Sequence, residues 1–431
     1  MSSLQLHTGL QVNRDRVVRR RDFLKGISLA GAAGASGTLG WKNLVAAKAD
    51  ELRSRGMACI LLFMKGGPSQ FETFSPKPGH ENGGETKAID TSVAGIQIAH
   101  GLPHMARVMQ DVAVLRAVTA KEGNHARAEF LMHTGYAPTP TVKHPTLGSI
   151  VAHQLGDVNF DLPSFVRIAG RTTDGGGLLG VEYDPFSMAN AEAPANAKLT
   201  TGQPRFERRM NLLSQLESSY ARGGAEREVA NHQKLYGKAA KMVTSARMEA
   251  FQLDREPEAV RARYGKGDFA SGCLLARRLI ESGVTFVEVG SNGWDTHDNV
   301  FERTTNLCGQ VDQPMAALIT DLKERGMLDK TLVIWMGEFG RTPKINPRGG
   351  RDHFPRASNV ALAGGGVRGG QVIGHTDAGG DTVTDHPVSV QDLFQSFCKS
   401  LGINPAIENM SAIGRPIKIV DGGQPVSELF G

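Results

Sequence analysis

The hydrophobic positions of the chain fall into two patterns: short apolar runs, and longer segments in which apolar residues recur every three or four positions. Short runs bounded by glycine or polar residues are typical of strands buried on both faces. Such runs predict strands at 57–64, 112–118, 164–168, 284–289, 331–336 and 359–363. The second pattern predicts helices at 124–135, 146–156, 206–264 and 388–401, the third of them broken near Gly223 and Gly224.

Strands and helices therefore alternate along the chain, and such alternation favours a mainly parallel sheet sandwiched by helices. Thr146 and Gly156 are suitable residues for the start and the end of the second helix. The sequence shows no internal repeat. We expect an α/β fold in which residues 50–431 form one large domain.

Two of the predicted strands are followed by loops that combine carboxylates with histidines. Glu338, Arg341, Arg351, Asp352 and His353 follow strand 331–336, and Asp295 and His297 follow strand 284–289. The carboxyl ends of parallel strands meet at one edge of a sheet, where open α/β sheets bind their ligands. Oxygen and nitrogen ligands suit zinc or manganese, and calcium is a third candidate.

We predict that four of these side chains hold a divalent metal, namely Asp295, His297, Asp352 and His353. Glu338 is a candidate ligand or base, and Arg341 is a candidate for binding an anionic group. The alternative interpretation is a solvated loop whose charges form ion pairs.

A third region of interest is the start of the helix predicted at 124–135. His125 and Arg127 lie at its N-terminus, where backbone amides and the helix dipole favour an anion. His125 is therefore a candidate catalytic residue and Arg127 a candidate anion-binding residue, although a structural role for His125 remains open. The turn 65–69 follows the first strand but lacks phosphate-loop spacing, and we expect it to direct Ser69, Gln70 and Glu72 towards the pocket.

Residues 1–49 have the layout of a twin-arginine export signal. Arg20 and Arg21 are followed by Phe-Leu-Lys, then by a Gly/Ala-rich apolar run, then by Ala-Lys-Ala at 47–49. The apolar run is short and glycine-rich for a membrane span, and no later run is long enough for one. We expect the export machinery as a partner, a periplasmic or exported location, and no membrane span after processing.

Removing this signal changes the charge of the protein. Residues 1–49 carry eight Lys/Arg and two Asp/Glu, a net +6, whereas the whole chain is +5, so residues 50–431 are about −1. This near-neutral charge gives no support for nucleic-acid binding. The four cysteines are widely spaced, and a Cys273–Cys308 disulfide remains open.

Several segments together resemble the bacterial proteins grouped as domain of unknown function 1501. They are 65–78, 126–135, Trp-Asp-Thr-His at 294–297, Gly-Glu-Phe-Gly-Arg-Thr-Pro at 337–343, Gly-Arg-Asp-His at 350–353, and 414–423. That family is similar to sulfatases and alkaline phosphatases. The resemblance implies their fold, with a metal site at the strand ends.

Compared with sulfatases, the chain departs at two points that matter for chemistry. Sulfatases place a modified cysteine or serine nucleophile before an Arg-Ala…Thr-Gly helix, where this chain has Asn124 and His125. They also end their first strand with aspartates, where this chain has Met-Lys-Gly-Gly at 64–67. Either Glu338 takes the place of the sulfatase metal ligand, or Asp352 and His353 are the retained pair.

Two functions therefore remain. One is a metal-dependent hydrolase of sulfate or phosphate esters, acting on a small anionic ester or a sulfated or phosphorylated carbohydrate. In this case a water of lowered pKa replaces the missing nucleophile. The other is a catalytically inactive member that binds a carbohydrate or a protein.

The signal layout gives a direct test of export. We expect the mature N-terminus at Asp50, and retention in the cytoplasm when Arg20→Lys and Arg21→Lys are combined. N-terminal sequencing and cell fractionation measure both. Continued export of the double variant by the same route would contradict the assignment.

Overall fold

The computed structural model describes residues 10–11, 17–18 and 56–431, except 171–174, 196 and 198. The chain divides into two compact units, Met1–Glu51 and Leu52–Gly431. In the first unit β1 (Leu10–Gln11) pairs antiparallel with β2 (Val17–Val18). The twin arginines and the predicted cleavage site lie outside the described residues.

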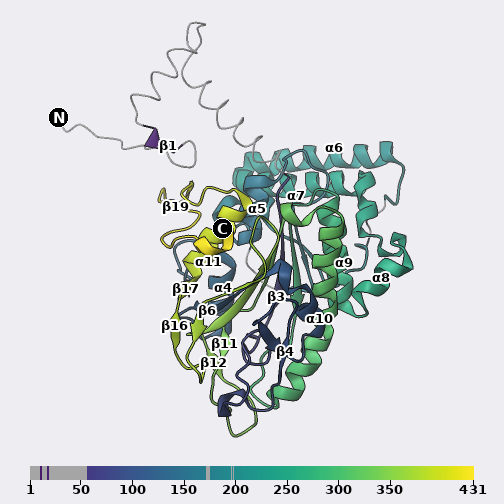
Figure 1. Ribbon diagram of the computed structural model, residues 1–431. Helices are drawn as coiled ribbons and strands as arrows, with labels where there is room; N and C mark the ends of the chain where they lie inside the picture. The colour runs from purple at the N-terminus through teal and green to yellow at the C-terminus, as the bar shows by residue number, and fades with distance from the viewer. Residues whose placement is uncertain (1–9, 12–16, 19–55, 171–174, 196, 198) are drawn as a thin grey trace, which may run out of the picture. The chain divides into compact units, whose positions relative to one another are not determined.

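A nine-stranded sheet forms the centre of the second unit, in the order β14-β6-β13-β10-β3-β9-β7-β8, with β17 paired to β6 (Figure 1). All its pairings are parallel except the two made by β13. The strands are β3 (Ala58–Met64), β6 (Val112–Thr119), β7 (Phe165–Ile168), β8 (Phe186–Met188), β9 (Phe286–Ser291), β10 (Thr331–Met336), β13 (Ser358–Ala363), β14 (Gln371–Ile373) and β17 (Val388–Ser389). The mainly parallel sheet predicted from the sequence is confirmed.

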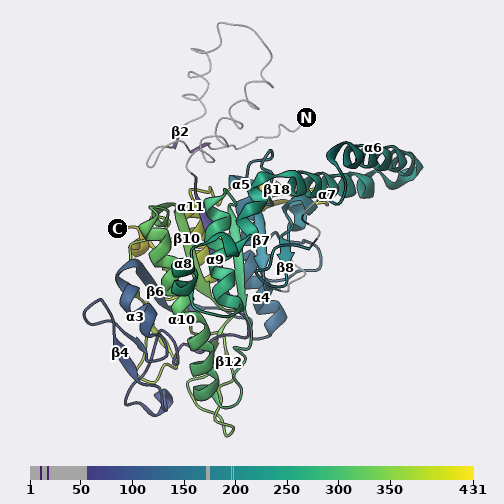
Figure 2. The same cartoon turned by 90° about the vertical axis from the view of Figure 1, so that its right-hand side faces the viewer.

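Helices cover both faces of this sheet (Figures 1 and 2). On one face lie α3 (Pro103–Val108), α8 (Glu258–Tyr264), α9 (Asp268–Glu281) and α10 (Val300–Glu324). On the other lie α4 (His125–Thr134), α5 (Leu147–Leu155) and α11 (Val390–Leu401). Ile60 and Leu62 of β3 belong to the first core, and Leu61 and Phe63 belong to the second. Alternate positions of the strand face opposite sides of the sheet, and both sides are buried. This explains why the apolar runs in the sequence are continuous.

The predicted strands at 57–64, 284–289 and 331–336 correspond to β3, β9 and β10, and all three are parallel neighbours in one sheet. The strand predicted at 359–363 is β13, which runs antiparallel to β10 and β6. This direction places the start of β13 at the edge where the parallel strands end. Residues preceding β13 therefore join the loops that follow β3, β6, β9 and β10.

The predicted helix ends agree with the structure for α4 and α5, and Gly156 is the C-cap residue of α5 as predicted. Gly135 ends α4 with a φ of 76°, and the Thr146 side chain accepts from the amide of Ser149 at the start of α5. The pattern at 206–264 is a hairpin of α6 (Gln203–Tyr220) and α7 (Glu226–Thr244), followed by short 3₁₀ turns and α8. Gly224, with a φ of 100°, interrupts the two helices as predicted. The closing helix begins at Val390 rather than 388, because Ser389 forms a capping box with Asp392.

In the described residues of the second unit, four antiparallel strand pairs lie outside the central sheet. They are β4 (Ala88–Asp90) with β5 (Gln97–Ala99), β11 (Gly340–Arg341) with β12 (His353–Phe354), β15 (His375–Thr376) with β16 (Val383–Asp385), and β18 (Glu408–Met410) with β19 (Pro416–Lys418). The β11–β12 pair matters for the site, because it brings His353 next to the loop that follows β10.

Two further expectations concern cysteines and membranes. All four cysteines are buried and free, so Cys273 and Cys308 do not form a disulfide. Within the described part of the chain, no helix combines the length and the hydropathy that a transmembrane segment requires.

A buried ion pair links the sheet to α4. Arg167 on β7 and Glu288 on β9 face each other in register, with Nε and Oε2 3.1 Å apart, and His133 Nε2 of α4 lies 3.4 Å from Glu288 Oε1. Burial alone would raise the pKa of Glu288, but the charges of His133 and Arg167 outweigh it and lower the pKa to about 2. Burial alone would lower the pKa of His133, whereas Glu288 raises it above its ordinary value. The ion pair between His133 and Glu288 thus joins α4, whose first residue is His125, to the central sheet.

We expect Glu288→Gln to lower the free energy of unfolding at neutral pH by about 3–5 kcal/mol, because it leaves buried cations without their counter-charge. The pKa of Glu288 falls from an ordinary 4.5 to about 2 on folding. Its stabilisation is therefore full above pH 4.5 and is lost as the pH falls towards 2. Urea unfolding across this range should show the difference between wild type and variant shrinking with falling pH. Glu408→Gln, on an exposed position of β18, is the control; an equal effect there would contradict the role of Glu288.

Candidate metal centre

The candidate site lies where the strands β3, β6, β9 and β10 end and β13 begins. Asp295 and His297 lie in the loop after β9, Glu338 in the loop after β10, and His353 on β12. His125 is the first residue of α4, which follows β6. The five side chains come from four separate segments, which the order of the sheet and the β11–β12 pairing bring together.

His297 is held by a carboxylate on one ring nitrogen and faces the centre with the other. Its Nδ1 lies 2.7 Å from Asp352 Oδ1. A carboxylate only accepts hydrogen bonds, so Nδ1 carries the proton, and in the neutral ring Nε2 offers a lone pair. That Nε2 lies 3.0 Å from His353 Nε2 and 3.0 Å from Asp295 Oδ1.

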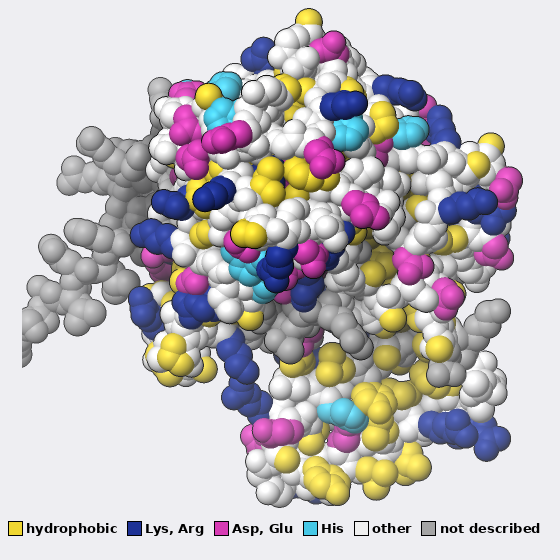
Figure 3. All heavy atoms as spheres, turned by 90° about the horizontal axis from the view of Figure 1, so that it is seen from below, with side chains coloured by type: hydrophobic (Ala, Val, Ile, Leu, Met, Phe, Trp, Pro, Cys, Tyr) yellow, Lys and Arg dark blue, Asp and Glu magenta, His cyan; other side chains and the backbone are white. Residues whose placement is uncertain are grey.

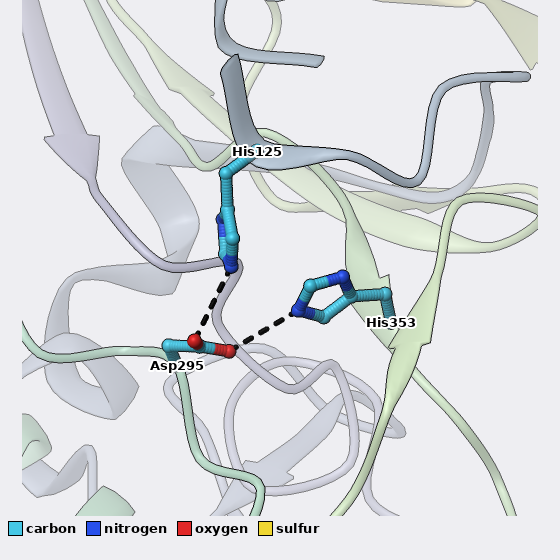
Figure 4. Close-up of side chains that lie close together, drawn as sticks. All are labelled: His125, Asp295 and His353. Atoms are coloured by element: carbon cyan, nitrogen blue, oxygen red, sulfur yellow. Dashed lines mark hydrogen bonds and ion pairs between the residues drawn. The ribbon is translucent and has the colours of Figure 1, made fainter. Parts of the chain in front are cut away.

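His353 is held in the same way, by a backbone carbonyl. Its Nδ1 lies 2.8 Å from the oxygen of Gly123, which can only accept, so Nδ1 again carries the proton. Burial is the main cause that lowers the pKa of His353, and the ring is neutral at pH 7. Its Nε2 lone pair points at Asp295 Oδ1, 3.2 Å away (Figure 4).

Three acceptor atoms therefore face one another in a triangle with edges of 3.0–3.2 Å: His297 Nε2, His353 Nε2 and Asp295 Oδ1. A single proton on one of these three atoms can form hydrogen bonds to the other two. Those other two atoms then still face each other as acceptors without a proton between them. A cation satisfies all three at once. Bonds of 2.0–2.1 Å at tetrahedral angles separate ligand atoms by about 3.3–3.4 Å, close to the observed edges. The outer hydrogen bonds to Asp352 and Gly123 are the kind that fix metal-binding histidines.

His125 approaches Asp295 from another side (Figure 4). Its Nε2 lies 3.3 Å from Asp295 Oδ2, and its ligand atom lies within 4.8 Å of those of Asp295 and His353. Its Nδ1 lies 2.7 Å from Glu338 Oε1. The hydrogen bond to Glu338 raises the pKa of His125 above its ordinary value, against the effect of burial. His125 can therefore carry a proton on Nε2 near neutral pH.

Arg341 neutralises Asp295 from the interior. Its guanidinium is fully buried and donates to Asp295 Oδ1 at 2.5 Å, to Gly67 O at 2.8 Å and to Arg351 O at 3.1 Å. Burial alone would raise the pKa of Asp295, but Arg341 and the two histidines lower it to about 2. Asp295 is therefore ionised at any physiological pH. Arg341 has no exposed surface with which to reach a bound anion, so its role is to hold Asp295.

Glu338 lies beneath the site rather than in it. The side chain has no exposed surface, and Oε1 accepts from His125 Nδ1 and, at 2.9 Å, from the amide of Gly66. Among the described residues Oε2 has no hydrogen-bond partner. Glu338 thus fixes the orientation of His125, and Phe339 packs beside both His125 and His353, with ring centroids 5.0 and 4.4 Å away.

The Gly-Gly turn after β3 supports this arrangement. A Cβ on Gly67 would lie 2.6 Å from the Phe339 ring, and one on Gly66 would lie 2.4 Å from the amide nitrogen of Asp295. Gln70 bonds both backbone groups of Arg341, at 2.7 and 2.8 Å. Contrary to expectation, Gln70 and Glu72 do not point at the site. Glu72 pairs with buried Arg351, 2.8 Å away, so these residues fix the loop that carries Arg341 and His353.

Of the residues singled out from the sequence, the structure brings Asp295, His297, His353 and His125 together. Asp352 does not face the centre of the cluster; it accepts a hydrogen bond from His297 instead. Arg127 is half-exposed and pairs with Glu122 at 2.6 Å, with no contact to the cluster among the described residues.

Sequence reasoning missed the carbonyl of Gly123, the ring of Phe339, and the use of Glu338 as the partner of His125. The only indication of these roles in the sequence is that the residues lie close along the chain to the histidines and to Glu338. Closeness along the chain does not specify contacts.

Comparison with known families assigns most of the chain. The sequence model of the family described as "Protein of unknown function (DUF1501)" matches residues 57–430. No curated protein matches the sequence.

Solved structures of similar fold include three from bacteria. The PsFucS1 sulfatase from Pseudoalteromonas sp. is 12% identical, with a TM-score of 0.38, over 84% of this chain and 71% of that one. A protein in the alkaline phosphatase superfamily from Vibrio parahaemolyticus is 11% identical, with a TM-score of 0.38, over 83% and 74%. The phosphonate monoester hydrolase of Agrobacterium radiobacter is 12% identical, with a TM-score of 0.34, over 87% and 77%. With TM-scores below 0.5 at such identities, these likenesses carry no argument about this chain.

The triangle of acceptors predicts which substitutions release a metal. We expect His297→Ala and His353→Ala each to abolish metal retention, and Asp352→Asn to weaken affinity about 10–100-fold, because it removes the partner that fixes His297. His125→Ala should retain the metal. Elemental analysis of the purified, folded variants measures this.

His375→Ala, at an exposed histidine on β15, is the matched control and should retain the metal. Circular dichroism separates metal loss from unfolding. Full metal retention in folded His297→Ala and His353→Ala would show that the cluster is a hydrogen-bond network rather than a metal centre.

Proposed function

The chain belongs to the DUF1501 family, and we propose that it is an exported, metal-dependent hydrolase of small sulfate or phosphate esters, sulfated or phosphorylated carbohydrates among them. The observation that carries the proposal is the triangle formed by His297 Nε2, His353 Nε2 and Asp295 Oδ1, whose outer hydrogen bonds leave its lone pairs facing inward. Export is proposed from the twin-arginine layout of the first 49 residues.

A divalent cation at this position would polarise an ester oxygen and lower the pKa of a water. This matters because Gly123 and Asn124, rather than a serine or cysteine, directly precede α4. Two nitrogens and one oxygen leave the coordination incomplete, as in catalytic rather than structural sites. Zinc and manganese suit this donor set better than calcium, which prefers oxygen ligands.

The site is open enough to receive a solute. The side chains of Asp295, His125, His297 and His353 are 43%, 35%, 31% and 24% exposed. Open α/β sheets bind their ligands at the carboxyl ends of the strands, and these partly exposed side chains lie there. Arg341 offsets the charge of Asp295, and His125 faces Glu338, which leaves Asp352 as the unmatched carboxylate. An added divalent cation would outweigh that single charge and give the site a net attraction for anions.

His125 is the candidate proton donor. It faces Asp295 Oδ2 rather than the triangle, and Glu338 raises its pKa, which favours a proton on Nε2. Protonating the leaving alkoxide is what hydrolysis of an ester bond requires of an acid. Glu338 acts through His125 and is a positioning residue, because it has no exposed surface.

The second candidate function is binding without catalysis. It is favoured by Asn124, whose side chain accepts from the Arg127 amide at 3.4 Å and caps α4 at the place where sulfatases carry a nucleophile. A binding protein of this kind would keep the metal and retain an anionic sugar without turnover.

The proposed acid gives a pH signature. We expect His125→Ala to lower kcat/KM about 10²–10⁴-fold without metal loss. An acid must be protonated to act, so wild-type activity should fall as the pH rises through the pKa of His125. Glu338→Gln keeps an acceptor for His125 Nδ1 but removes the negative charge that raises this pKa, and it should move the fall to lower pH.

Release of phosphate or sulfate from aryl and sugar esters, measured across pH with the retained metal, tests both changes. Glu122→Gln, at the carboxylate paired with Arg127, is the control and should leave the profile unmoved. Metal-loaded, folded protein that binds these esters but turns over none would establish the binding function instead.

A further inference from the structure

The turn at 346–350, between β11 and β12, lies against the backbone of the loop that carries His297. β9 ends at Ser291, so a stretch of loop separates His297 from the sheet. Three backbone hydrogen bonds join this loop to the turn. They run from Arg351 N to Thr296 O at 3.0 Å, from Asn299 N to Arg348 O at 3.3 Å and from Val300 N to Gly349 O at 2.9 Å. The position of His297 therefore depends on the turn as well as on the sheet.

The side chain of Asn346 makes four hydrogen bonds in this turn. Its Oδ1 accepts from the amides of Arg348 at 2.9 Å and Gly350 at 3.0 Å. Backbone amides can only donate, so these two contacts fix which end of the side chain is the oxygen. Its Nδ2 donates to His297 O at 3.0 Å and to Asp352 Oδ1 at 3.4 Å. Asn346 thus links the turn to the backbone of His297 and to the carboxylate that fixes the His297 ring.

The turn approaches His297 more closely than a side chain at position 350 would allow. A Cβ on Gly350 would lie 2.0 Å from the carbonyl carbon of His297 and 2.3 Å from the amide nitrogen of Asp298. Gly349, with a φ of 68°, forms an antiparallel bridge with Asp298. Glycine at position 350 is therefore required for the close approach of the two backbones.

Asp352 lies at the surface and is not held by packing. β12 lies towards the lower end of the second unit in Figures 1 and 2, and Figure 3 views the molecule from below, where acidic, basic and histidine side chains lie close together. The side chain of Asp352 is 55% exposed. An exposed carboxylate keeps one orientation only where hydrogen bonds hold it, and those of Asp352 come from His297 Nδ1 and Asn346 Nδ2.

We propose that Asn346 is a positioning residue of the metal centre, which holds the backbone of His297 and the carboxylate of Asp352 at the same time. This inference rests on the metal centre of the proposed function. Without Asn346, Asp352 turns towards solvent and the loop at 296–300 loses a link to the turn. His297 Nε2 then spends less time facing the centre. Residues that support a metal ligand in this way change metal affinity by about 10–100-fold.

Zinc affinity of the full chain, measured by competition with a chelator of known affinity, tests the proposal. We expect Asn346→Ser to weaken zinc binding about tenfold. A serine hydroxyl still accepts from the amide two residues on, but it is too short to replace the Nδ2 contacts. The matched control is Asn404→Ser, because exposed Asn404 accepts from the amide of Ala406 at 3.0 Å in the same kind of turn. This control should bind zinc like wild type.

A double variant separates positioning from a general loss of structure. Asn346 acts in part through Asp352, so combining Asn346→Ser with Asp352→Asn should cost less than the product of the two single losses. Circular dichroism checks that each variant is folded.

Gly350→Ala tests the same contact without changing Asn346. The added Cβ displaces the backbone of His297, and zinc binding should weaken by at least the same factor. Gly309→Ala, where a Cβ meets nothing within 4 Å, is its control. In metal-free protein, hydrogen exchange at the amides of Asn299 and Val300 should be faster in Asn346→Ser and in Gly350→Ala, because both amides donate to the turn.

The outcomes distinguish this role from the metal centre itself. Folded Asn346→Ser that binds zinc as tightly as wild type overturns the role of Asn346 and leaves the metal centre standing. Two losses that simply multiply, or unchanged exchange at Asn299 and Val300 in both variants, do the same. A wild type that takes up no zinc overturns the metal centre, and the role of Asn346 in it falls too.

Discussion

Two imidazole nitrogens and one carboxylate oxygen lie 3.0–3.2 Å apart at the carboxyl edge of the central sheet, and their outer partners hold their lone pairs inward. Arg341 supplies positive charge to Asp295 from the interior, but the two imidazole lone pairs still face that oxygen unless a proton or a cation lies between the three atoms. Asp352 and the carbonyl of Gly123 prevent either ring from relieving it by exchanging its two nitrogens. This constraint is what turns a group of polar loops into a candidate metal centre.

The remainder of the fold serves this arrangement through strand order and direction. β3, β9 and β10 are adjacent and parallel, so the loops that follow them meet at one edge. β13 runs the other way, so His353, which precedes it, reaches the same edge. Buried Arg341 then fixes Asp295, while Glu288 and His133 join α4, which begins with His125, to the sheet. Arg341, Glu338, Glu288 and His133, which support the site, are buried, whereas Asp352 supports His297 from the surface.

The sequence was sufficient for the fold class because buried parallel strands are apolar on both faces, as the run at 57–64 illustrates. It also pointed to Asp295, His297 and His353, since each follows or precedes a predicted strand. It did not reveal that Asp352 supports His297 instead of facing the centre, nor that Arg341 is buried. Both depend on the β11–β12 pairing, a contact between short segments of no distinctive pattern. The direction of β13 was equally hidden, because a buried strand has the same composition in either direction.

X-ray absorption at the metal edge of the purified protein, combined with anomalous diffraction, tests the central claim most directly. The account predicts one divalent ion bound by two imidazole nitrogens and one carboxylate oxygen at about 2.0–2.2 Å, with anomalous density between His297, His353 and Asp295. A folded protein that takes up no such ion when zinc or manganese is supplied, and shows no density between these three residues, would contradict it.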